Sequence, residues 1–185
     1  MKAICGNVYW MRRVVIVLCL FLALFIYIGS IDSSRVFALG QNQEISKLQI
    51  TDESINPGSG YAYSFKRLKE NITLDLLSIF SDKKANYYLK LVSTRLAELK
   101  YVIFNKDEDD FQTSSQRYFS TAGQATQFIL DKNLNSIKGP AKDLFTSQMS
   151  KLDVLRDSFP YDTAQYRFIQ DDINYLTSYI TQLGR

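Results

Sequence analysis

Apolar residues recur at steps of three and four along most of the chain from Tyr61 to Leu183. This spacing places them on one face of an α-helix, which completes a turn every 3.6 residues. The first stripe consists of Tyr61, Phe65, Leu68, Ile72, Leu76 and Ile79. The second consists of Ala85, Leu89, Val92, Leu96, Leu99 and Ile103. No stretch alternates with the two-residue period of a strand, so the pattern predicts an all-α fold.

The sequence FSD, residues 80–82, separates these two helices. Ser81 or Asp82 is suited to cap the second helix, because its side-chain oxygen can accept an unpaired backbone N–H. So short a connection predicts an antiparallel helical hairpin in which the two stripes face each other. The expected contacts are Leu68 with Leu96 or Ala97, and Leu76 with Leu89.

Three further helices follow. The acidic stretch NKDEDD, residues 105–110, favours a helix start, since carboxylates there complement the helix dipole. A calcium loop is the alternative reading, but the spaced oxygens and central glycine of an EF-hand are missing. Pro140 suits the first turn of the fourth helix, and Pro160 ends that helix and opens the last one. The three predicted faces are Phe111, Tyr118, Ala122, Ala125 and Ile129; Phe145, Met149, Leu152, Leu155 and Phe159; and Tyr166, Ile169, Ile173, Leu176, Ile180 and Leu183.

These patterns together predict a bundle of about five helices over residues 61–185. The last helix repeats the alternating steps of the second, which favours packing at a shallow angle. We therefore expect the last helix to pack along the hairpin and cover its two stripes. Residues 32–60 are predicted to be a linker, because Gly40 to Gly60 is polar and ends in NPGSG. Within this linker, one short ordered turn is expected at Ile45, Leu48 and Ile50.

A continuous apolar run, Val14–Ile28, precedes the linker and extends to Ile31. Eighteen helical residues span roughly 27 Å, close to the hydrocarbon thickness of a bilayer. Residues 14–31 therefore read as a transmembrane or signal segment, and residues 1–13 as a short cytoplasmic N-terminus. Basic residues before the run predict that everything after Ile31 is exported.

Two outcomes remain open for this segment. Val36 and Ala38 provide the small side chains that signal peptidase needs, which allows cleavage after Ala38. The length of the apolar run and the long spacer before Ala38 favour retention as a membrane anchor. The exported part is therefore either tethered to the cell membrane or released as a secreted or periplasmic domain.

The charge of the chain excludes nucleic acid as a partner. The net charge of +3 comes entirely from the first forty residues, which hold four basic side chains and one acidic one. From Gln41 onward, eighteen basic side chains balance eighteen acidic ones. Nucleic-acid binding requires a concentrated basic surface, which this balance does not supply.

The residue inventory predicts no catalytic, cofactor-binding or metal site. The chain has no histidine, and its two cysteines, Cys5 and Cys19, precede the exported part. This removes Ser-His and Cys-His nucleophiles and thiolate or imidazole metal sites. The carboxylate pairs Asp171–Asp172 and Asp153–Asp157 fit solvated helix faces better than acid–base groups. Local ion pairs are expected between Arg95 and Glu98 and between Lys66 and Glu70.

The exported part is rich in tyrosine, and several of these residues fall beside the core stripes. Two interpretations stay open for them. They line the edge of the core with their hydroxyls in water, or they form a partner-binding face of rigid amphipathic rings. The candidate partner-binding aromatics are Tyr87, Tyr101, Tyr175 and Tyr179.

Residues 56–104 resemble an uncharacterised bacterial family, domain-of-unknown-function family 5667. The shared elements are a breaker at Pro57–Gly60, then Tyr63, Lys66-Arg67, Glu70, Phe80-Ser81-Asp82, Lys83-Lys84-Ala85 and Arg95-Leu96-Ala97-Glu98. The chain departs from the family pattern where Tyr88 replaces an expected histidine. The resemblance implies an extracytoplasmic helical domain behind one membrane segment, and it brings no catalytic residues.

The sequence thus predicts a non-enzymatic helical domain that acts as an interaction or structural module at the bacterial cell envelope. Its partners would be the membrane, through residues 14–31, and a protein. The alternative is a ligand-sensing or chaperone-like envelope domain that uses a groove between helices.

Overall fold

The computed structural model describes residues 44–50, 57 and 60–185 of the chain. Every regular element in these residues is helical and none is a strand, which confirms the predicted all-α fold. Residues 14–31 and the cleavage site after Ala38 lie outside the described residues. In the part that is described, no helix has the length and apolar character needed to cross a membrane.

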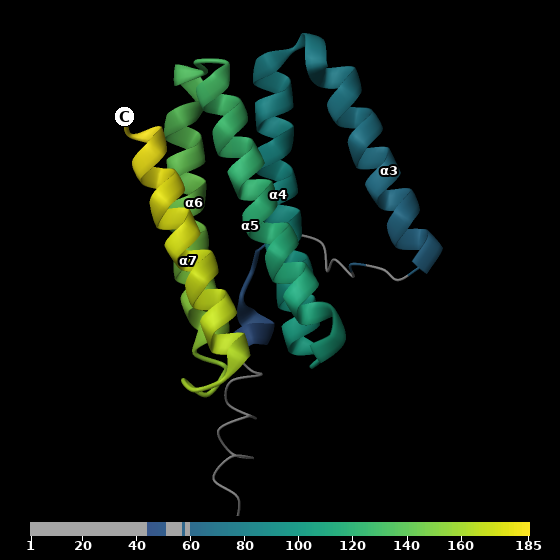
Figure 1. The fold of residues 1–185 in the computed structure, drawn as a ribbon, viewed down its shortest axis with the longest axis vertical. Helices are drawn as coiled ribbons and strands as arrows, with labels where there is room; N and C mark the ends of the chain where they lie inside the picture. Colours follow the sequence, from purple (N-terminus) through teal and green to yellow (C-terminus); the bar gives the residue numbers. More distant parts are fainter. Residues whose placement is uncertain (1–43, 51–56, 58–59) are drawn as a thin grey trace, which may run out of the picture. The chain divides into compact units, whose positions relative to one another are not determined.

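Within residues 60–185, five long α-helices and one short 3-10 helix follow one another. They are α3 (Gly60–Leu76), η1 (Leu77–Ile79), α4 (Ser81–Phe104), α5 (Glu108–Asp131), α6 (Asn135–Arg156) and α7 (Ala164–Leu183) (Figure 1). The chain divides into two compact units, Met1–Gly40 and Gln41–Arg185, and these helices all belong to the second.

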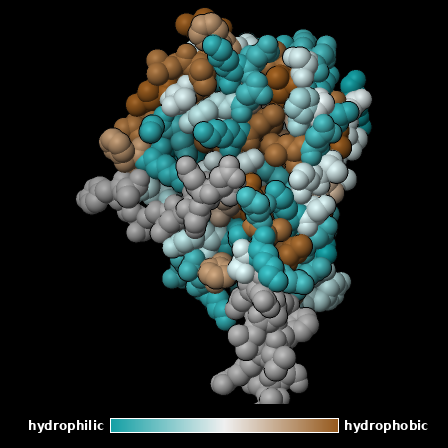
Figure 2. Space-filling model, turned by 180° about the vertical axis from the view of Figure 1, so that it is seen from behind, coloured by the Kyte–Doolittle hydropathy of each residue, from teal (hydrophilic) through white to brown (hydrophobic). Residues whose placement is uncertain are grey.

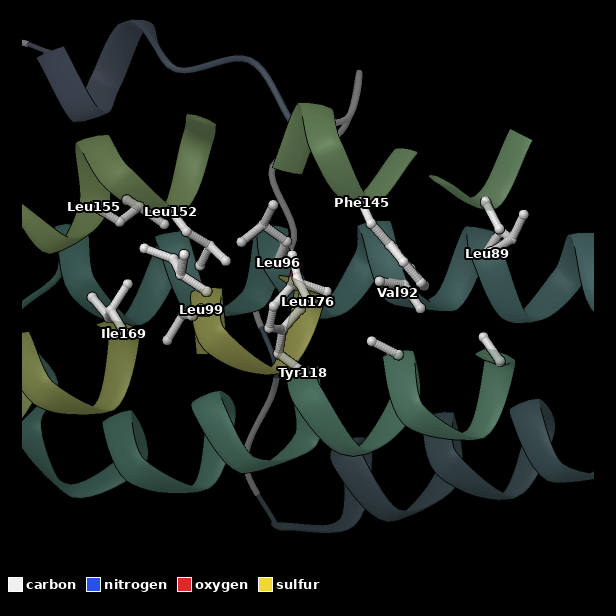
Figure 3. Close-up of a cluster of buried hydrophobic side chains, with 14 of the residues drawn as sticks. Leu89, Val92, Leu96, Leu99, Tyr118, Phe145, Leu152, Leu155, Ile169 and Leu176 are labelled. Atoms are coloured by element: carbon white, nitrogen blue, oxygen red, sulfur yellow. The ribbon is translucent and has the colours of Figure 1, made fainter. Parts of the chain in front are cut away.

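Helices α4 to α7 enclose the hydrophobic core. The closest packing is between α4 and α5, between α6 and α7, and between α5 and α7. Side chains from all four helices converge there, among them Leu96, Tyr118, Phe145 and Leu176 (Figure 3). The stripes predicted for α4 and α5 are buried throughout, and the residues of the other two stripes are buried or packed against the core except Tyr166, which is half-buried. Periodicity therefore identified the inward face of each of these helices.

The segment before α3 contributes to this core. Residues 44–47 form one helical turn, and Ile45 is only 2% exposed. Leu48 and Ile50 pack against the same cluster, and the Lys100 Nζ donates a hydrogen bond of 2.7 Å to the Leu48 carbonyl. The expected ordered turn is present, and it belongs to the folded unit.

Two helix starts differ from those expected from the prolines. Helix α6 begins at Asn135, so Pro140 lies inside the helix and not in its first turn. Ile137 and Ala141, on either side of Pro140 in the sequence, are buried. Their burial offsets the loss of the backbone hydrogen bond that proline cannot donate. Pro160 lies in the connection after α6, and α7 begins four residues later. There the Thr163 Oγ1 caps the helix by accepting from the Tyr166 N–H at 3.3 Å.

The acidic stretch starts a helix, as predicted. Asp107 is the N-cap of α5 and accepts a hydrogen bond of 3.2 Å from the Asp110 N–H. Glu108, Asp109 and Asp110 occupy the first turn, where their charges complement the helix dipole.

The hairpin forms, but its two stripes do not face each other. The helices meet at Phe80, which takes the N-cap position of α4 without a side-chain cap, so Ser81 and Asp82 are not caps. Leu68 and Leu76 are more than half exposed, so their predicted contacts with α4 are wrong. Helix α7 packs on α5 and α6 and does not cover the hairpin. The physical reason is that the apolar face of α4 is already covered by the core (Figure 1).

Replacing Leu96 with aspartate should unfold the domain, whereas Lys90→Ala should be neutral. Leu96 is fully buried in the core, and an unpaired carboxylate there costs on the order of several kcal/mol. Lys90 is exposed on the same helix. Thermal unfolding followed by circular dichroism compares the two variants, and equal melting temperatures would contradict this description of the core.

Candidate interaction surface

Helix α3 turns its charged face toward α4. The Arg95 Nη1 of α4 donates to both carboxylate oxygens of Glu98 at 2.8 Å, and its Nη2 donates to the Glu70 carboxylate of α3. Lys66 of α3 forms an ion pair with Glu98, and Arg67 donates to Glu70 at 3.0 Å. Three cations and two carboxylates thus form one network between the helices, which we call the α3–α4 ion network.

The centre of this network is removed from water. Arg95 is fully buried, and Glu70 and Glu98 are nearly so. Burial lowers the pKa of Arg95, but the charges and hydrogen bonds of Glu98 and Glu70 outweigh it, so the pKa lies above its ordinary value. Arg95 therefore stays charged and requires both carboxylates. Removing one member of such a network leaves a buried charge without compensation.

The sequence identified only part of this network. The predicted pair of Arg95 with Glu98 is present. Lys66 pairs with Glu98 across the hairpin, and its expected local partner Glu70 pairs with Arg67 and Arg95. The residues paired across the hairpin are close to those expected to lie opposite each other when the chain folds back at Phe80. The spacing along each helix gave no sign that the charges would be buried.

A second contact ties α3 to the bundle. The Arg117 guanidinium of α5 lies 4.1 Å from the centre of the Tyr63 ring of α3. A cation over an aromatic face at this distance is an attractive arrangement. Tyr63, Lys66 and Glu70 follow one another at steps of three and four, so these contacts with the bundle lie on one face of α3.

The opposite face of α3 is apolar and exposed. Glu70 lies two residues from both Leu68 and Ile72, which places each about 200° around the helix from it. The exposed set, which we call the α3 stripe, is Phe65, Leu68, Ile72, Leu76 and Ile79. Its members are between 49% and 83% exposed, and Phe80 at the turn is 53% exposed.

The α3 stripe is large for a protein surface. In Figure 2, hydrophobic side chains gather along the upper left, where α3 lies in that view. Six large side chains that are each 49% exposed or more present several hundred Å², and the largest patch on a typical monomer is roughly 300–600 Å². Continuous apolar surface of this size usually marks an interaction site. The sequence predicted the stripe correctly but assigned it to the core.

Two of the four candidate tyrosines lie together. Tyr175 stacks on Phe119 of α5 with ring centres 4.7 Å apart, and Tyr179 lies 6.3 Å from Tyr175. The Tyr179 hydroxyl donates to the Phe119 carbonyl at 3.4 Å. Gly123 makes room for this ring, since an added Cβ would lie 2.8 Å from the hydroxyl. These contacts hold α5 against α7.

The other two candidates lie elsewhere. Tyr87 and Tyr101 are both on α4, half-buried, and about four helical turns apart. The four tyrosines therefore do not form a single face. The α3 stripe contains none of the four, although Tyr175 is itself 43% exposed on α7.

A second polar cluster lies inside the four-helix core. Asp172 of α7 is 1% exposed and accepts a hydrogen bond of 3.0 Å from the Ser115 hydroxyl. Nearby, the Tyr118 hydroxyl donates to the Gln148 side-chain carbonyl at 2.9 Å. In the part of the chain that the structure describes, Asp172 Oδ1 finds no partner. The expectation that Asp172 is solvated was therefore wrong.

Burial determines the charge state of Asp172. It raises the pKa of this carboxyl to about 8, with a contribution from the charge of Asp171, while the Ser115 hydrogen bond acts in the opposite sense. Burial and the Asp172 charge also raise the pKa of Tyr118. Asp172 is thus largely protonated at neutral pH. The sequence carries a signal for this burial, since Asp172 follows Ile169 by three residues and precedes Leu176 by four.

The remaining candidate carboxylates are on the surface, as predicted. Asp171 is exposed, and Asp153 and Asp157 are ion-paired with Arg156 at 2.9 and 2.8 Å. Within the described residues, no cluster of three or more acidic, cysteine or histidine side chains is arranged to hold a metal ion.

Comparisons with known protein families, with curated proteins and with solved structures find no match to this chain. The resemblance of residues 56–104 to family 5667 therefore stays a prediction. The geometry of the described residues is what bears on function.

The stability of the domain should fall as pH rises toward 8, and Asp172→Asn should remove this dependence. Between the unfolded pKa near 3.8 and the folded value of about 8, the folded state keeps a proton that the unfolded state releases. The free energy of unfolding then falls by about 1.4 kcal/mol per pH unit from this group. Urea unfolding at pH 5, 6 and 7 measures the slope. Asp171→Asn, on the exposed neighbour, should keep it, and equal slopes in wild type and Asp172→Asn would refute the assignment.

Arg95→Ala should destabilise the domain by about 3–5 kcal/mol, because it leaves the Glu70 and Glu98 carboxylates buried without a guanidinium. Arg167→Ala removes an exposed arginine from α7 and should change stability by less than about 0.5 kcal/mol. Urea denaturation at pH 7 compares the two. A similar midpoint for both variants would show that α3 is not held by the network.

Proposed function

We propose that this chain is a non-enzymatic helical interaction module of the bacterial cell envelope, exported and anchored by residues 14–31. The observation that carries the proposal is the α3 stripe, an exposed apolar face held outward by the α3–α4 ion network. A surface of this kind is suited to bind another protein, since burial of apolar surface is the dominant favourable contribution to most protein–protein association. The balanced charge of the domain gives no support for nucleic acid as the partner.

The fixed orientation of α3 supports an interaction role. Three residues of α3 take part in ion pairs, and Tyr63 lies against Arg117 of α5. A helix held in this way presents its apolar face without having to fold on binding. Preorganisation of this kind reduces the ordering cost of association.

A chaperone-like envelope domain is the second candidate, and the same stripe favours it. Exposed aliphatic and aromatic side chains also bind unfolded segments of other proteins. The two functions differ in selectivity: an interaction module binds a defined partner at fixed stoichiometry, whereas a chaperone-like domain binds many unfolded chains.

A pull-down from envelope extract tests the proposal. The wild-type chain should retain a defined partner in a stoichiometric amount, and Leu68→Ser/Leu76→Ser should lose it. Both leucines are more than half exposed, so this variant should fold normally by circular dichroism. The matched control is Gln116→Ser/Gln124→Ser, an exposed pair at the same eight-residue spacing on α5. Equal retention by all three proteins would overturn the assignment of the stripe, and a broad set of unfolded clients would favour the chaperone-like function.

A further inference from the structure

The spacing of the α3 stripe is the same in both directions along the sequence. From Phe65 to Ile79 the steps are three, four, four and three, so the pattern is symmetric about Ile72. Phe65 to Leu76 lie on α3, and Ile79 follows them in η1. A two-fold axis that pairs two copies of a helix in antiparallel orientation matches each position with its mirror position in the sequence. Such an axis beside Ile72 would place Phe65 opposite Ile79 of the second copy, Leu68 opposite Leu76, and Ile72 opposite itself.

The polar residues around the stripe are compatible with this pairing. Glu70, Lys66 and Arg67 point toward the bundle and would stay in their network. Lys69 and Asp75 are exposed, and each lies on one edge of the stripe. In the antiparallel register the two Lys69 residues, like the two Asp75 residues, are offset by six positions, which is about 9 Å along the helices. The pairing therefore buries no charge and brings no like charges into contact.

The available area is compatible with a small dimer interface. A standard interface buries about 800 Å² per partner. The six exposed side chains of the stripe and of Phe80 supply several hundred Å² of apolar surface on each copy. Flanking residues of α3 add to it when two helices pack 8–10 Å apart, which is the usual distance.

We propose that the occupant of the α3 stripe is a second copy of this chain, in an antiparallel, two-fold symmetric α3–α3 pairing centred on Ile72. This inference rests on the proposed function, in which the stripe is the interaction surface, and it names the partner. The assembled core would then comprise the two four-helix bundles joined through their α3 helices. A foreign protein or a lipid surface at the stripe are the other outcomes that the test distinguishes.

Disulfide crosslinking of the full chain in its membrane tests the pairing. Cys5 and Cys19 are first replaced by serine, so that each variant carries one thiol. Ile72→Cys should form a covalent dimer under mild oxidation, because a residue on the axis meets its own copy within the ~7 Å between Cα atoms that a disulfide allows. Gln116→Cys, exposed on α5, is the control and should stay monomeric.

Mixing two variants tests the register. Leu68→Cys and Leu76→Cys, coexpressed in one cell, should crosslink with each other at least several-fold more than either does alone. Self-crosslinking of each without gain on mixing would show a parallel pair and overturn the antiparallel register. Circular dichroism confirms that each variant is folded.

Absence of crosslinking above the Gln116→Cys control would overturn the dimer. The Leu68→Ser/Leu76→Ser pull-down then separates the two ideas: if that variant still loses a foreign protein partner, the interaction function stands and only the dimer fails. Stripe-dependent binding to phosphatidylglycerol vesicles without crosslinking would assign the stripe to a lipid surface, and this too would overturn the dimer.

Discussion

The orientation of α3 depends on one buried guanidinium. Arg95 lies fully inside the α3–α4 interface, where Glu98 of its own helix and Glu70 of α3 accept its hydrogen bonds. Because arginine cannot lose its charge in a protein, rotating Glu70 away would leave that charge buried and only partly compensated. Glu70 must therefore face α4, and helix geometry then places Leu68 and Ile72 on the far side. The exposure of the α3 stripe and the pairing of Arg95 with Glu70 are thus consequences of the same arrangement.

This arrangement divides the domain into two parts that are held in place by different interactions. Helices α4 to α7 bury apolar faces against one another, which is the main source of stability in a domain of this size. Helix α3 buries charges instead, and buried ion pairs add little net stability because desolvation offsets their attraction. Their effect is geometric, since the Arg95 fork admits few positions of its carboxylate partners. In this chain the network determines which face of α3 is presented to solvent.

The sequence predicted the core well and the surface poorly, for a physical reason. An apolar stripe at helical spacing shows which face is buried when other stripes are available to cover it, as for Leu96, Tyr118 and Leu176. The stripe does not show which element covers that face. The sequence therefore predicts a core position for the α3 stripe as it does for the other stripes. Local pairing along each helix fully explains the spacings of Lys66, Glu70, Arg95 and Glu98. The sequence pattern therefore does not indicate the partners that these residues have on the other helix. The prediction of a solvated Asp172 is wrong because its position along α7 lies among Ile169, Ile173 and Leu176. The burial of these apolar side chains places the Asp172 carboxyl in the core.

The coupling between the network and the stripe has a consequence for binding. A partner that binds the outward stripe binds only those states in which Glu70 faces Arg95, so it stabilises the network by mass action. Conversely, any change that weakens the network allows α3 to turn, and the population that presents the stripe then falls. Affinity at the stripe must therefore depend on residues such as Arg95 that a bound partner does not touch. The buried charges are the positioning element of the surface, and the exposed apolar side chains are its contact element.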